Sequence, residues 1–103
     1  MRVVRLSFTA RDGTALRVFL ARARPVYEAL PGIELRLWQD IHQPDRYVEE
    51  IRYASHSVHA ADERRLSDDP QMRALIAEWH GLIEGLSVTT LDDVTADLGR
   101  PAP

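Results

Sequence analysis

The segment IELRLWQDIHQPDRYVEEIRY, residues 33–53, constrains the fold more than any other part of the chain. Polar and apolar residues alternate on both sides of a turn signal at Pro44 and Asp45, which is typical of a β-hairpin. We therefore predict two paired strands, over residues 33–40 and 46–53.

One register of this hairpin separates charged side chains from apolar ones. With Asp40 opposite Arg46, opposite charges meet on one face. The pairs on this face are Trp38 with Val48, Arg36 with Glu50 and Glu34 with Arg52, and those on the other are Ile33 with Tyr53, Leu35 with Ile51 and Leu37 with Glu49. A one-residue slip would mix the two faces. Each charged pair is worth only about 0.2–1 kcal/mol, so the pairs select the register more than they stabilise the sheet.

Size and composition limit the possible classes of protein. A chain of 103 residues with 45% hydrophobic and 28% charged residues is typical of one small globular domain. We expect this domain over residues 1–92 and a tail over 93–103. The net charge of −3, the lack of cysteine and the lack of a long apolar run predict a cytoplasmic protein with no nucleic-acid or membrane partner.

The segments before the hairpin predict a strand and a helix. Residues 3–9 alternate as a strand, and apolar residues recur at helical spacing over residues 14–30. Pro25 lies inside this helix, so we expect a kink at residues 21–24 or a break there.

After the hairpin, two helix-start signals appear. Ser55 is a plausible N-cap, and acidic residues before Pro70 form the second signal. An apolar stripe follows up to Ile83, and we expect Gly85 to end that helix. Residues 86–91 are rich in β-branched side chains and predict a last strand.

This order of elements predicts a ferredoxin-like βαββαβ fold, an α+β fold in which helices cover one face of a four-stranded antiparallel sheet. The other face would be bare. A homodimer that packs two such faces together, a dimeric α+β barrel, would bury it. The residues expected at that interface are Trp38, Arg36, Glu50 and Val48.

The sequence also resembles the antibiotic biosynthesis monooxygenase-like domains of the dimeric α+β barrel superfamily. The positions that carry the resemblance are Pro31, Gly32, Pro44, Asp45, Tyr47, Glu49, Ser55 and His59. It implies an enzyme that needs no cofactor or metal, because an electron-rich aromatic or polyketide-like substrate reacts with dioxygen as its anion. The chain has no asparagine, which some catalytic members use, and this favours the alternative of a non-catalytic ligand-binding or regulatory dimer.

Three residues are candidates for catalysis. Tyr53 should face the helices at the end of its strand, where its phenol could bind a substrate oxygen. His56 and His59 share a helix face, and an imidazole can serve as a base near neutral pH. With Glu63 these histidines could instead bind a metal, and each candidate could also be an ordinary core or surface residue.

The pocket walls are expected to include Trp79, Phe19 and Leu35, which would bind a small aromatic molecule. Trp79 lies in the apolar stripe of its helix, so core packing is its first interpretation. The acids Asp62 and Glu63 are expected to be helix-face residues without paired-carboxylate geometry.

Overall fold

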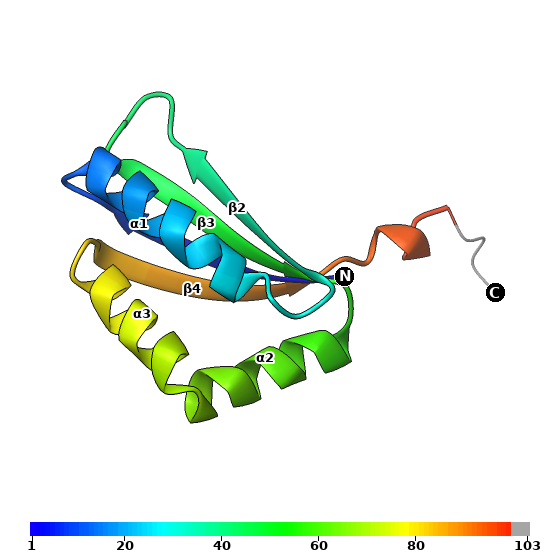
Figure 1. The fold of residues 1–103 in the computed structure, drawn as a ribbon. Helices are drawn as coiled ribbons and strands as arrows, with labels where there is room; N and C mark the ends of the chain where they lie inside the picture. Colours follow the sequence, from blue (N-terminus) through cyan, green and yellow to red (C-terminus); the bar gives the residue numbers. More distant parts are fainter. Residues whose placement is uncertain (100–103) are drawn as a thin grey trace.

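The computed structural model describes residues 1–99, which form a four-stranded antiparallel sheet with three helices over one face (Figure 1). The elements in chain order are β1 (Arg2–Thr9), α1 (Gly13–Tyr27), β2 (Ile33–Gln39), β3 (Arg46–Tyr53), α2 (His56–Asp68), α3 (Pro70–His80), β4 (Glu84–Asp92) and the 3-10 turn η1 (Thr95–Asp97). The strand order β2-β3-β1-β4 confirms the predicted ferredoxin-like fold.

The central hairpin has the predicted register. Pairing runs from Ile33 opposite Tyr53 to Gln39 opposite Tyr47, so Leu35 meets Ile51 on the helix side and Arg36 meets Glu50 on the other. The alternation of side chains across the pleat therefore decides which residues of β3 reach the interior.

Helix α1 begins at a standard cap, because the side chain of Asp12 accepts a hydrogen bond of 3.0 Å from the amide of Ala15. The helix passes Pro25 without the break that we considered at residues 21–24, and it ends at Tyr27 instead of residue 30. Pro25 cannot donate to the carbonyl of Ala21, but the helix ends two residues later, so only its last turn is affected.

Both helix-start signals in the second half of the chain are confirmed, so this half contains two helices where the predicted βαββαβ order has one. Ser55 caps α2, and Asp69 caps α3 by accepting a 2.9 Å hydrogen bond from the amide of Gln71. Together these caps account for the sharp corner between α2 and α3 (Figure 1).

The predicted end of α3 at Gly85 is wrong. The helix ends at His80, and Gly85 is the second residue of β4, with a φ of +66°. The pairing of β1 with β4 shifts between Ser7 and Thr9, opposite this glycine, so Gly85 supplies the left-handed conformation of a β-bulge. The apolar spacing predicted a longer helix because Ile83, which lies in the turn between α3 and β4, is also buried.

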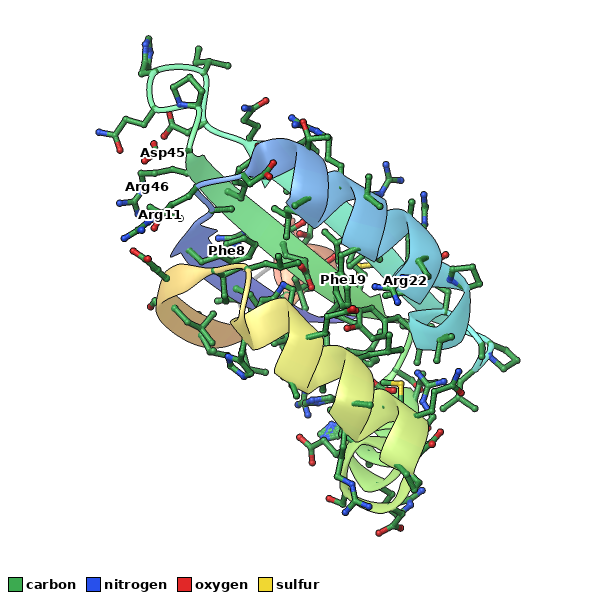
Figure 2. The ribbon with its side chains drawn as sticks, turned by 60° about the vertical axis from the view of Figure 1, so that its left-hand side comes forward. Phe8, Arg11, Phe19, Arg22, Asp45 and Arg46 are labelled. Carbon is green, nitrogen blue, oxygen red and sulfur yellow. The ribbon has the colours of Figure 1, made fainter. Side chains whose placement is uncertain are left out.

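The core is densely packed at the end of the sheet where α1 begins. Phe8 and Phe19 point into the space between sheet and helices (Figure 2), and both are almost fully buried. Phe8 stacks near Tyr47 and meets the ring of Trp79 edge-on at 5.5 Å. Among residues 1–99, no helix is long and apolar enough to cross a membrane.

Candidate functional site

A cavity of about 330 Å³ lies between the sheet and the helices, toward the end of β3. Its walls are mostly apolar, and this volume is at the lower end of the range for small-molecule sites. The lining residues are Val4, Leu6, Tyr27, Glu49, Ile51, Tyr53, His59, Asp62, Glu63, Leu66, Met72, Ile76, Trp79, Val88 and Thr90. Glu49 and Tyr53 are four residues apart on one strand, so their Cα atoms are about 13 Å apart and the cavity has two polar ends.

Tyr53 lies at one end and faces the helices, as predicted. Its side chain is buried, and its hydroxyl donates a 2.6 Å hydrogen bond to Oδ2 of Asp62. Burial, and then the bond to Asp62, raise the pKa of the Tyr53 phenol well above its ordinary value. The phenol therefore keeps its proton, and its oxygen has only acceptor capacity left for a ligand.

Asp62 lies on α2 as a helix-face residue, and at 4% exposed it is turned into the interior. Its second carboxylate oxygen accepts hydrogen bonds from Arg65, at 2.9 and 3.1 Å. Arg65 also donates to the carbonyl oxygens of Val26 and Tyr27 at the end of α1. This chain of contacts fixes α2 against α1 and holds Tyr53 in place.

The two candidate histidines have different surroundings. His59 lines the cavity, where its ring lies 4.6 Å from that of Tyr53 and its Nε2 lies 3.1 Å from Oε1 of Glu63. His56 is exposed and is not among the lining residues. No three potential metal-ligating side chains come together within residues 1–99, so His56, His59 and Glu63 do not form a preassembled triad.

Glu49 and Trp79 form the other polar end of the cavity. Glu49 is 3% exposed and Trp79 is 6% exposed, yet within residues 1–99 neither the Oε1 atom of Glu49 nor the Nε1 atom of Trp79 has a partner at hydrogen-bond geometry. Burial raises the pKa of Glu49 from its ordinary value to about 7, and the nearby indole N–H offsets this rise only in part. The carboxyl group is thus available to a ligand.

The residues expected to bind substrate lie in three different places. Trp79 lines the main cavity, whereas Phe19 is buried in the packed part of the core. Leu35 is also a core residue, and it borders a smaller hollow between α1 and β2.

Sequence reasoning did not identify Glu49 as a functional candidate. The predicted register placed this acid on the apolar face opposite Leu37, and that position was the available signal. Asp62 had a similar signal, because it lies between Val58 and Leu66 in the apolar stripe of its helix.

The sheet face away from the helices carries an ordered polar cluster. Glu50 is only 6% exposed, and its carboxylate accepts hydrogen bonds from Arg5, Arg52 and the indole N–H of Trp38. Burial alone would raise the pKa of Glu50, but these three donors together lower it. Trp38 remains 51% exposed above this cluster.

No known family model matches the sequence, and no curated protein matches it. Solved structures nevertheless match over most of the chain. A Deinococcus radiodurans protein assigned by name to the antibiotic biosynthesis monooxygenases has a TM-score of 0.70 at 15% identity, covering 90% of this chain and 92% of its own.

Two further solved structures have the same architecture. SnoaB from Streptomyces nogalater, described as a cofactor-independent oxygenase, has a TM-score of 0.69 at 17% identity over 89% of this chain and 92% of its own. The Rv0793 protein from Mycobacterium tuberculosis has a TM-score of 0.68 at 25% identity, covering 90% of this chain and 94% of its own. The chain therefore has the fold of the antibiotic biosynthesis monooxygenase domains.

Proposed function

We propose that this protein is a cofactor-independent oxygenase that acts on a compact, electron-rich aromatic or polyketide-like molecule. The observation that carries the proposal is the cavity of about 330 Å³, whose walls are mostly apolar and on which a few polar groups converge. The description of SnoaB as a cofactor-independent oxygenase, together with the shared fold, supports the same choice.

The reaction balances with dioxygen as the sole oxidant. A substrate methylene next to an aromatic ketone loses a proton, and the electron pair remains on the carbanion. The carbanion reduces dioxygen and bonds to it, giving a hydroperoxide after protonation. Loss of water from the hydroperoxide leaves a carbonyl group, so the methylene compound and O₂ become the ketone and H₂O. The protein must bind the substrate, exclude water and accept the first proton.

In this proposal Tyr53 and His59 act at one end of the cavity. The oxygen of Tyr53 accepts a hydrogen bond from a substrate hydroxyl, because its own proton is held by Asp62. The ring of His59 lies against Tyr53 and forms part of the same wall. His56 has no direct role, since it lies outside the cavity.

Oxygen uptake by the purified, metal-free protein tests the proposal. We expect folded protein to accelerate oxygen consumption with at least one member of a panel of anthrones, naphthols and quinols. The control is the same protein after heat denaturation. If no compound of the panel reacts faster with folded protein, the proposal of oxygenase activity is contradicted.

A second candidate is a ligand-binding protein without catalysis. The observation that favours it is that Tyr53 already donates its proton to Asp62 and that Nε2 of His59 already faces Glu63, so both side chains have structural partners. Saturable quenching of Trp79 fluorescence by a naphthol, without oxygen uptake, would support this candidate.

The fold also suggests how two copies associate. We propose a homodimer in which the sheet faces away from the helices pack together through Trp38, Arg36, Glu50 and Val48. In its support, the carboxylate of Glu50 is already neutralised and held by three donors, so little ordering is needed on association. Exposed tryptophan over such a cluster is typical of interface centres.

A further inference from the structure

Glu49 and Trp79 present an unpaired acceptor and an unpaired donor to the same apolar cavity. Buried polar side-chain atoms are rarely left without partners, because each one costs about 1–3 kcal/mol. Within residues 1–99, the atoms in this state are Glu49 Oε1 and Trp79 Nε1. The indole N–H of Trp79 lies near enough to the Glu49 carboxyl to offset part of its pKa rise, yet neither atom makes a hydrogen bond of normal geometry, so a ligand between them can complete both bonds.

The scaffold holds both groups firmly. Glu49 lies in the interior of β3, between neighbours on β1 and β2, where it pairs with Leu6 and Leu37. Trp79 lies in the last turn of α3 and packs edge-on against Phe8 at 5.5 Å. A carboxyl and an indole on rigid elements are well suited to bind one molecule in a fixed orientation.

The surroundings of Glu49 contain little charge. Its neighbours on the adjacent strands are leucines, α1 contributes the phenol of Tyr27, and α3 contributes the indole of Trp79. The other titratable groups of the cavity, on α2, lie at the Tyr53 end. Among residues 1–99, no basic side chain offsets the charge of an ionised Glu49, which keeps the carboxyl protonated up to near-neutral pH.

We infer that Glu49 is the base that removes a proton from the substrate carbon, and that Trp79 Nε1 donates a hydrogen bond to the substrate oxygen that gains negative charge. The C–H bond breaks, its electron pair delocalises onto that oxygen, and the proton moves to Glu49. The inference rests on the proposed oxygenase function and replaces the histidines as the base. It fits the chemistry of both groups, because a buried carboxylate is a stronger base than an exposed one and an indole N–H only donates.

Hydrogen exchange without oxygen isolates this step from oxygenation. Anthrone serves as the probe, because its methylene is acidic and its ketone oxygen takes up the charge. In deuterated buffer under argon, proton NMR follows the loss of the methylene signal. We expect wild-type protein to accelerate exchange above the buffer rate, with a rate that rises with pH and levels off above about pH 7.

Two variants remove the two groups separately. Glu49→Gln should lower protein-catalysed exchange at least 100-fold, in the range of general-base contributions. Trp79→Phe keeps the aromatic contact with Phe8 and should lower exchange about tenfold. A tenfold loss in Trp79→Phe, with an unchanged melting temperature, supports the inference even if Glu49→Gln does not fold. Tyr47→Phe, a buried tyrosine that does not line the cavity, is the matched control and should exchange at the wild-type rate.

The outcomes separate the inference from the proposed function. Exchange that depends on Glu49, without oxygen uptake in air, supports the base and contradicts the oxygenase. Oxygen uptake that persists in Glu49→Gln supports the oxygenase and overturns the base. Wild-type exchange no faster than in buffer also overturns the inference.

Discussion

At the scale of single residues, Glu49 is a site residue whose ionisation in the apolar cavity lowers the stability of the folded protein. Burial raises its pKa to about 7, so in the folded state it gains a charge in an apolar cavity as pH rises. The protonated Glu49 carboxyl contributes its full stability at pH values below its pKa in the unfolded chain, near 4.5. This contribution is lost as the pH rises through its pKa in the folded protein. A structure selected only for stability would place an apolar residue here.

We predict that Glu49→Gln changes how stability depends on pH. Relative to the variant, the wild-type protein should lose about 3 kcal/mol of unfolding free energy between pH 4.5 and pH 8, since each pKa unit corresponds to about 1.4 kcal/mol. Urea unfolding at a series of pH values measures this difference. The exposed Glu84→Gln is the control and should follow the wild type, whereas a constant difference between wild type and Glu49→Gln would contradict the raised pKa.

Tyr53 and Asp62 give a second prediction at this scale. Tyr53→Phe leaves one buried oxygen of Asp62 without its 2.6 Å partner, so we expect a loss of about 1–3 kcal/mol in the free energy of unfolding. Tyr47→Phe on the same strand is a matched control, because its hydroxyl makes only a 3.5 Å contact with Gln39. Equal losses of unfolding free energy in both variants would show that the hydrogen bond to Asp62 does not stabilise the protein more than the weak contact of Tyr47 does.

At the scale of elements, the hairpin was the most predictable part of the chain. Its register followed from alternation and charge pairing, which act between neighbouring strands and are visible in the sequence. The end of α3 was not predictable in this way, because Ile83 is buried by the tertiary fold outside any helix. The unpaired state of Glu49 depends on what α1 and α3 place above β3, and no local pattern records that.

The bulge in β4 gives a prediction for an element. Gly85→Ala should destabilise the protein by about 1 kcal/mol or slightly more, because the residue has a φ of +66° although an added Cβ would meet nothing within 4 Å. Gly81→Ala is the control, since Gly81 has a helical φ of −70°, although its added Cβ would lie 3.3 Å from the carbonyl oxygen of Glu78. Thermal unfolding of both variants checks the prediction, and a larger loss in Gly81→Ala would contradict it.

At the scale of the whole molecule, the bare sheet face gives a prediction about association. Trp38→Glu removes an apolar side chain from the proposed interface, and Arg36→Glu places a carboxylate opposite Glu50. Each variant should therefore weaken the proposed homodimer. Sedimentation velocity across micromolar concentrations measures the effect, with the exposed Arg22→Glu on α1 as the control. A wild-type mass equal to one chain at these concentrations would contradict the dimer.

In the proposed function, oxygenation takes place in the cavity between sheet and helices. Val88 lines this cavity and is 55% exposed, so Val88→Trp should narrow the entrance without disturbing the packed core. We would measure oxygen uptake by wild type, Val88→Trp and the smaller control Val88→Ala, with the most reactive compound of the panel. We predict at least a tenfold loss in Val88→Trp and near wild-type uptake in Val88→Ala, whereas full activity in Val88→Trp would show that oxygenation takes place elsewhere.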